Sequence, residues 1–230
     1  CTSTVTVQDN VDPVANCQNI TVQLDATGNA SIIASQLNNG STDACGIALL
    51  SVSPNTFTCA NVGANTVTLT VTDVNGNSST CTATVTVEDN VNPVAVCQDI
   101  TVQLLPNGTA TIVAGDVNNG SSDACGIASL SVSPSSFTCA NVGANTVTLT
   151  VTDVNGNVST CTSTATVLDQ VAPVAVCQNI TISLSGTGNA SITSAQIDNG
   201  SSDACGIATI TVSPNTFTCA NVGANNVVLT

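Results

Sequence analysis

The chain has 230 residues with no Lys, Arg, His, Trp, Tyr or Met, and its 14 carboxylates give a formal charge of -14. This composition argues against an enzyme, because His and Lys are the usual general bases and proton shuttles at neutral pH. A surface without cations cannot neutralise phosphates, which excludes nucleic-acid binding and disfavours anionic membranes. No apolar run is long enough to span a bilayer.

One unit is written three times along the chain. Residues 1–10 align with residues 81–90 and are predicted to be the last strand of a preceding repeat. The repeats follow at residues 11–90, 91–170 and 171–230, the third without its last strand. All 12 cysteines recur at a spacing of 80 residues, and residues 61–80 differ from residues 141–160 at one position. Near-identical copies of this kind indicate an array of modules.

The strands expected in the second repeat are residues 100–104, 109–114, 127–132, 145–153 and 161–167. In the fourth of these, Val147, Leu149 and Val151 alternate with threonines, which is the period of a half-buried strand. Asn155 and Gly156 lie between the last two strands and predict a hairpin turn. No segment has helical periodicity.

Short strands separated by turn signals every 8 to 12 residues are typical of a small immunoglobulin-like sandwich. The predicted fold class is all-β, with tandem immunoglobulin-like antiparallel β-sandwiches arranged end to end. Phe57, Phe137 and Phe217 are the only aromatic residues, one in each repeat. Cores with so few large side chains bury little apolar area, so we expect each repeat to need cross-links.

The cysteines predict a disulfide framework, because they lack His partners and the paired C-x2-C clusters of zinc sites. Such frameworks persist in oxidising compartments, which predicts a secreted or cell-surface protein. Strand directions place the hairpin turn and the loop around Cys125 at one pole of a repeat. This predicts the bridges Cys45–Cys81 and Cys125–Cys161, with Cys205 joined to a residue outside this chain.

The second bridge within a repeat follows by elimination and joins Cys17 to Cys59 and Cys97 to Cys139. The alternative is a bridge between repeats, Cys59–Cys97 and Cys139–Cys177, which would stiffen the array. The cysteines assigned to bridges are Cys17, Cys45, Cys59, Cys81, Cys97, Cys125, Cys139, Cys161, Cys177 and Cys219.

Three segments rich in carboxylates and amides are expected to meet at the same pole: the linker, a loop aspartate and the hairpin turn. Grouped oxygen ligands suit Ca2+, which takes six to eight of them, and a cation there would stiffen one repeat against the next. The other interpretation is that these segments are only a turn and a polar linker. The candidate ligands are Asp9, Asp12, Asp43, Asp73, Asn75, Asn77, Asp89, Asn92, Asp123, Asp153, Asn155, Asn157, Asp169 and Asp203.

Several motifs together resemble the HYR (hyalin repeat) domain and cover nearly all of each repeat. They are Asp89, Pro93, Cys97, the Asp123-x-Cys125-Gly126 loop, residues 137–143, the run ending at Asp153, Gly156-Asn157 and Thr160-Cys161-Thr162. The copies, rich in Thr and Val and free of basic residues, are also similar to tandem repeats of bacterial secreted surface proteins. The resemblance implies an immunoglobulin-like fold and a role in adhesion or extracellular scaffolding. Three features depart from the family: Asn141-Val142-Gly143 replaces a Pro-containing turn, Cys139 is an added thiol, and a strand aromatic is missing.

The predicted function is a structural extracellular fibre or stalk of disulfide-stabilised, calcium-stiffened repeats. The alternative is an adhesin module that recognises a glycan or a protein, although the Tyr, Trp and Arg anchors of such surfaces are missing. The expected partners are neighbouring repeats of a longer chain or copies of the molecule along a fibre. In the second case residues 1–8 would complete the third repeat of another molecule by strand addition, without counterparts of residues 151–160.

Overall fold

The first two repeats each contain six strands, one short α-helix and one 3-10 turn. The computed structural model describes all residues from Cys1 to Thr230. In the first repeat the elements are β1 (Ile20–Gln23), β2 (Asn29–Ser31), α1 (Ala34–Leu37), β3 (Ile47–Ser53), β4 (Thr56–Thr58), η1 (Cys59–Asn61), β5 (Gly63–Asp73) and β6 (Ser78–Glu88). In the second they are β7 (Ile100–Gln103), β8 (Thr109–Thr111), α2 (Ala114–Val117), β9 (Ile127–Ser133), β10 (Ser136–Thr138), η2 (Cys139–Asn141), β11 (Gly143–Asp153) and β12 (Val158–Leu168).

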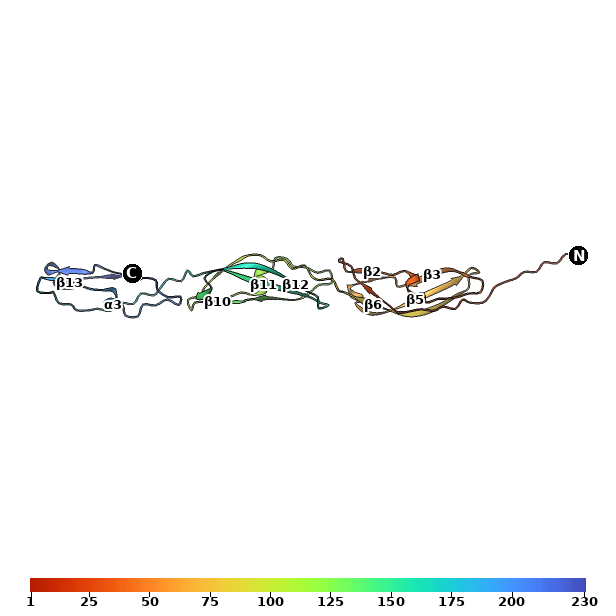
Figure 1. Ribbon diagram of the computed structural model, residues 1–230, viewed down its shortest axis with the longest axis horizontal. Coiled ribbons are helices and arrows are strands. Elements are labelled where there is room, and N and C mark those ends of the chain that lie inside the picture. Colours follow the sequence, from red (N-terminus) through yellow and green to blue (C-terminus); the bar gives the residue numbers. More distant parts are fainter. The chain divides into compact units, whose positions relative to one another are not determined.

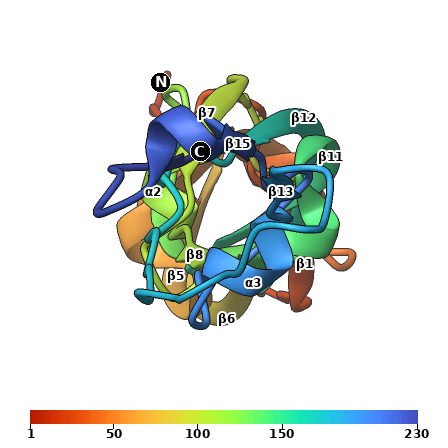
Figure 2. The ribbon, with the colours of Figure 1, turned by 90° about the vertical axis from the view of Figure 1, so that its left-hand side faces the viewer.

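The third repeat has fewer paired strands than the other two. Its elements are β13 (Asn189–Ser191), α3 (Ser194–Ile197), β14 (Val212–Ser213), β15 (Thr216–Thr218), η3 (Cys219–Asn221) and β16 (Val228–Leu229). Strands β13 and β15 pair, as do β14 and β16. Helix α3 and strand β13 are drawn in blue in Figures 1 and 2.

Contacts divide the chain into two compact units that cut through the second repeat. Unit one comprises Cys1–Val96, Gly120–Leu130 and Thr150–Thr160, and unit two comprises Cys97–Asn119, Ser131–Leu149 and Cys161–Thr230. The repeat boundaries drawn from the sequence stay a prediction. No helix of the chain is long and apolar enough to cross a membrane.

Two sheets enclose the core of each of the first two repeats. In the first repeat a four-stranded sheet in the order β1-β6-β5-β3 accompanies the pair β2-β4, and the second repeat repeats this order as β7-β12-β11-β9 with β10-β8. Strands β5 and β6 lie side by side in Figure 1. Phe57 of β4 packs in one cluster with Val67 of β5 and Val85 of β6. This all-β architecture confirms the predicted fold class.

One strand pair in each four-stranded sheet departs from the antiparallel pattern. Strand β1 runs parallel to β6, with Ile20 opposite Val85, and β7 runs parallel to β12 in the same way. The first and last strands of a repeat therefore point in the same direction. A chain that enters a repeat at one pole and leaves it at the other requires this.

The alternation of apolar and polar residues predicts the buried face correctly. Val147, Leu149 and Val151 of β11 are 0% exposed. The Asn-Gly turn forms as expected, with Gly156 at a φ of 95°, a conformation that favours glycine. Leu49 is exposed and Leu50 is half-buried, as the comparison of copies indicates.

Two short elements differ from the prediction. The strand expected at residues 109–114 ends at Thr111, and α2 follows it. A single helical turn is too short to show a period of 3.6 residues. It is held by the Asp116 carboxylate, which accepts a hydrogen bond of 2.8 Å from the Val113 amide, and by the fully buried Val117. The three-residue strand β10 was not predicted either.

Candidate functional site: the cystine-linked junctions

The chain contains two kinds of disulfide. Cys17–Cys81 and Cys97–Cys161 each close a loop within one repeat, with sequence separations of 64 residues. Cys59–Cys125 and Cys139–Cys205 each join one repeat to the next, with separations of 66 residues. Their Cα atoms lie 5.2 and 5.1 Å apart, within the usual range for disulfides.

The predicted disulfide partners are wrong. The bridges Cys45–Cys81, Cys125–Cys161, Cys17–Cys59 and Cys97–Cys139 do not form, and neither do the alternative bridges Cys59–Cys97 and Cys139–Cys177. Cys1, Cys45, Cys177 and Cys219 are unpaired and exposed. The expectation that some bridges run between repeats is correct, but they use the loop cysteine of the following repeat.

The parallel strand pair explains the bridge within a repeat. Because β1 runs beside β6, the segment before β1 brings Cys17 next to Cys81. Cys45 lies at the pole instead, where the Gly46 carbonyl accepts a hydrogen bond from the Val74 amide in the hairpin turn. Cys81 is three residues inside β6, which places it about 10 Å from that turn at the rise of a strand.

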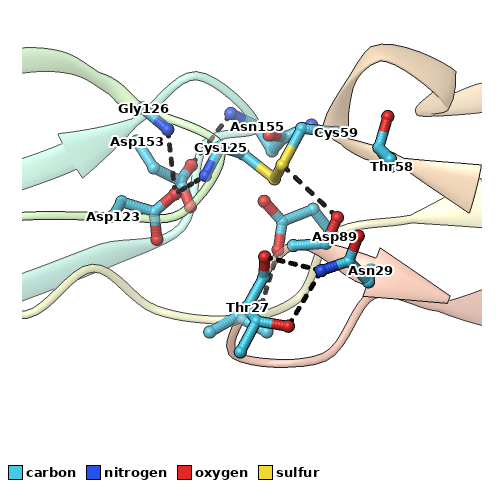
Figure 3. The surroundings of a disulfide bond; sticks show 12 residues. Thr27, Asn29, Thr58, Cys59, Asp89, Asp123, Cys125, Gly126, Asp153 and Asn155 are labelled. Atoms are coloured by element: carbon cyan, nitrogen blue, oxygen red, sulfur yellow. Dashed lines mark hydrogen bonds between the residues drawn. A yellow bond between two sulfur atoms is a disulfide. The ribbon is translucent and has the colours of Figure 1, made fainter.

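The bridge between repeats lies where the Asp25–Asn29 turn of the first repeat meets the loop that carries Cys125. Figure 3 shows this junction, all of whose residues belong to unit one. The Asp25 carboxylate accepts hydrogen bonds from the amides of Thr27 and Asn29, which fixes the turn. The Cys59 sulfur lies 3.8 Å from the Gly28 carbonyl oxygen.

Gly28 is required by this close approach. Its φ is +75°, and a Cβ atom there would lie 2.7 Å from the Cys59 sulfur and 3.3 Å from the Ala124 Cβ of the second repeat. Gly108 stands in the same relation to Cys139 and Ala204, at 2.8 and 3.1 Å. The analysis of the sequence passed over these glycines, although their recurrence at 80-residue spacing was a signal.

The predicted convergence of acidic segments at one pole is found in the structure. Ligand atoms of Asp89, Asp123 and Cys125 lie within 4.8 Å of one another, and the same holds for two further groups, Asp9 with Asp43 and Cys45, and Asp169 with Asp203 and Cys205. The amide of Asn157 donates a hydrogen bond of 3.0 Å to the Asp89 carbonyl oxygen, so the linker and the hairpin turn meet. Cys125 and Cys205 are bridged, which leaves only carboxylates as ligands there.

The hairpin aspartates are occupied by the turn itself. The Asp153 carboxylate accepts hydrogen bonds from the Asn155 and Asn157 amides at 2.9 and 2.8 Å and from the Asn157 side chain at 2.8 Å. Burial raises the pKa of Asp153, but these hydrogen bonds outweigh burial and lower the pKa below its usual value. Asp73 is held by the same contacts from Asn75 and Asn77, and its pKa is lowered for the same reasons. These residues fit the turn interpretation.

Asp89 differs from the hairpin aspartates. It is 7% exposed, its Oδ1 accepts a hydrogen bond of 3.0 Å from the Val91 amide, and its Oδ2 is buried without any hydrogen-bond partner. A buried, unpaired carboxylate oxygen is costly unless a donor or a cation meets it. The facing Asp123 carboxylate cannot donate while ionised, and its Oδ1 already accepts from the Cys125 and Gly126 amides. Asp89 and Asp123 therefore fit a cation.

The other predicted ligands do not join these groups. Asp12 and Asn92 are exposed and lie outside them. In the first group the Cys45 thiol is free, and a hydrogen bond with Asp9, together with the negative charge of Asp9 and Asp43, raises the pKa of the thiol.

Comparisons with known proteins assign the chain to no family. No model of a known protein family matches it, and no curated protein does. Among solved structures, it is similar to the extracellular cadherin domains 1–4 of protocadherin gamma B7 at 15% identity and a TM-score of 0.35, covering 89% of this chain and 63% of that one. Human protocadherin-24 EC1-2 follows at 16% identity and a TM-score of 0.32, covering 70% and 100%. The fibronectin(III)-like modules of Clostridium thermocellum CbhA give 14% and 0.26, covering 68% and 92%.

The chain spans 63% and 35% of the first two of these structures, the second being the protocadherin gamma B4 extracellular domain. TM-scores below 0.5 carry no argument about function. The four disulfides themselves are typical of proteins in oxidising compartments such as the extracellular space.

Proposed function

We propose that the chain is a non-catalytic structural array of the extracellular space, in which each repeat is tied covalently to the next to form a protease-resistant stalk or fibre that supports adhesion or a matrix. The observation that carries this proposal is the overlap of the four disulfide loops. The loops run from 17 to 81, 59 to 125, 97 to 161 and 139 to 205, and each begins before the previous one ends.

The overlap has a direct consequence for the integrity of the chain. Every peptide bond between Cys17 and Cys205 lies inside at least one loop. One backbone cut anywhere in this range therefore leaves both fragments joined by a disulfide. A string of independently bridged modules would instead part at the first cut in a linker. The absence of Lys and Arg removes the cleavage sites of trypsin-like proteases as well.

The proposal includes a Ca2+ ion at the junction of the first two repeats, held by Asp89 and Asp123. The unpartnered, buried Oδ2 of Asp89 and the adjacent Asp123 carboxylate support this assignment. Ca2+ binds such hard oxygen ligands and would neutralise two adjacent like charges in a protein that has no basic side chain. Asp9 with Asp43 and Asp169 with Asp203 are the equivalent pairs.

Glu88 allows a sharp test, because it is the only glutamate in the chain. The oxidised protein, with its free thiols alkylated, is unfolded in urea without reductant and digested with a glutamate-specific protease. We expect one band at full mass on a non-reducing gel and fragments 1–88 and 89–230 after reduction. The bond after Glu88 lies inside the Cys59–Cys125 loop alone.

Two variants complete the test. Cys59→Ser/Cys125→Ser should part into the two fragments without reductant. Cys139→Ser/Cys205→Ser should stay at full mass, since its missing bridge does not span Glu88. Separation of the wild-type fragments before reduction would refute the covalent array.

A further inference from the structure

The third repeat is open where the first is closed. In the first repeat, Val85 and Val87 of β6 share one core cluster with Phe57 and are 0% and 1% exposed. No strand takes the place of β6 in the third repeat, and its core cluster contains only Ile192, Ile197, Phe217 and Leu229. A hollow lined by β13 and β15, including Phe217, is open to solvent.

The segment that should pair with this absent strand is also uncovered. Residues 180–183 correspond to β1, yet they form no strand, and Ile180 and Ile182 are each 37% exposed. The third repeat therefore presents an empty strand position between residues 180–183 and β16, beside an incomplete apolar core.

Residues 1–8 carry the sequence that fits this position. They differ from residues 81–88 of β6 at two positions. They form no strand, and Val5 and Val7, the counterparts of Val85 and Val87, are 81% and 89% exposed. An extended segment with one apolar face adds readily to the open edge of a sheet.

The four unpaired cysteines match in the same way. By the 80-residue repeat, Cys1 corresponds to Cys81 and Cys177 to Cys17, which is a bridged pair. Cys45 corresponds to Cys125 and Cys219 to Cys59, which is the other bridged pair. The setting of Cys219 is already formed, since a Cβ on Gly188 would lie 2.9 Å from its sulfur, as at the two occupied junctions.

We infer that residues 1–8 of a second copy of this chain insert into the third repeat, and that the bridges Cys1–Cys177 and Cys45–Cys219 then lock the two copies head to tail. The in-chain register places Val5 opposite Ile180 and Val7 opposite Ile182. This inference deepens the proposed structural role by naming its partner.

One docking event satisfies both cysteine pairs. Asp9 follows residues 1–8 directly, just as Asp89 follows β6, so insertion of the strand carries Asp9, Asp43 and Cys45 towards Cys219. A chance match of one thiol pair would not bring the second pair together. The joined repeat lacks counterparts of residues 71–80, including the buried Asp73 turn, so we expect the joint to melt before the intact repeats.

The covalent step needs an oxidant, and a small-molecule disulfide such as oxidised glutathione supplies it. For each bridge, one thiolate attacks the small disulfide and releases one thiol, and the second cysteine then displaces the other. Two cysteine thiols and one small disulfide thus give one protein disulfide and two small thiols. The raised pKa of Cys45 disfavours its thiolate, so the reaction is run at about pH 8.5.

The test uses two full-length variants that each keep one end. Variant one is Cys1→Ser/Cys45→Ser and keeps Cys177 and Cys219. Variant two is Cys177→Ser/Cys219→Ser and keeps Cys1 and Cys45. On oxidation with glutathione, each variant alone should stay monomeric on a non-reducing gel. An equimolar mixture should give a dimer of one copy of each, with both predicted bridges in its peptide map.

The role of the strand is tested separately with variant two. Val5→Asp/Val7→Asp should slow dimer formation by about tenfold or more, because both buried contacts are lost. Thr4→Asp/Thr6→Asp adds the same charge on the opposite face of the segment and should slow it far less. Monomers in the mixture, homodimers of either variant, or equal rates for the two aspartate variants would overturn the inference. These outcomes leave the Glu88 test unaffected, because it concerns bridges within one chain.

Discussion

Replacement of Asp89 by Asn should have opposite effects with and without calcium. The Asp89 Oδ2 is buried and unpartnered, and the Asp123 carboxylate lies beside it. An Asn amide in that place could donate to the Asp123 carboxylate and would remove one of two adjacent negative charges. An unpaired buried polar group costs about 1 to 3 kcal/mol. In a chelator, Asp89→Asn should therefore raise the free energy of unfolding by about that amount.

With calcium the order should reverse. A ligand present at 100 times its Kd stabilises the folded protein by about 2.7 kcal/mol. The wild type gains this stabilisation, whereas Asp89→Asn loses a charged ligand and should gain much less. Urea unfolding followed by far-UV circular dichroism, in EGTA and in CaCl2, measures both effects. Tryptophan fluorescence is of no use, because the chain has no Trp.

Asp99→Asn is the matched control. The Asp99 carboxylate is exposed and accepts a hydrogen bond from the Thr164 amide, and Asn19 has the same role towards Thr84 in the first repeat. This variant should unfold like the wild type in both buffers. A wild type indifferent to calcium, or an Asp89→Asn variant less stable than the wild type in EGTA, would contradict the cation assignment.

Three further predictions concern stability. Cys59→Ser/Cys125→Ser and Cys17→Ser/Cys81→Ser should each lower the free energy of unfolding by about 4 kcal/mol in urea titrations, because separations of 66 and 64 residues close loops of nearly equal entropy; a marked inequality would refute the loop-entropy argument. Gly28→Ala should destabilise more than Gly40→Ala, since both glycines have a φ of +75° but only Gly28 faces the Cys59 sulfur; equal Tm losses would count against the close contact. The lowered pKa values of Asp73 and Asp153 mean that their contribution to stability is present above the usual aspartate pKa and is lost as pH falls through the lowered values; Asp73→Asn should flatten this acid loss in circular dichroism titrations, and an unchanged profile would contradict it.

The sequence was a good guide to the sheets and a poor guide to the bridges. The alternation in residues 145–153 predicts which side chains of β11 are buried, because burial on one face of a strand follows the period directly. The Asn155-Gly156 pair predicts the hairpin for a similarly local reason. Both features depend on neighbours in the sequence.

The disulfide partners depend on which strands lie side by side, and periodicity does not report this. Nothing in residues 20–23 shows that they pair in parallel with β6, and that pairing brings Cys17 to Cys81. The convergence of Asp89 and Asp123 was predictable from strand directions alone. The unpartnered oxygen of Asp89 was not, because it depends on the positions of individual donors.

The partner of Cys59 is the most direct test of the account. The oxidised chain is alkylated and digested with pepsin at low pH, where disulfides do not exchange, and the linked peptides are identified by mass spectrometry. The account predicts Cys59 joined to Cys125 and Cys139 joined to Cys205. Peptides that join Cys59 to Cys17 and Cys125 to Cys161 would show independently bridged modules and would contradict it.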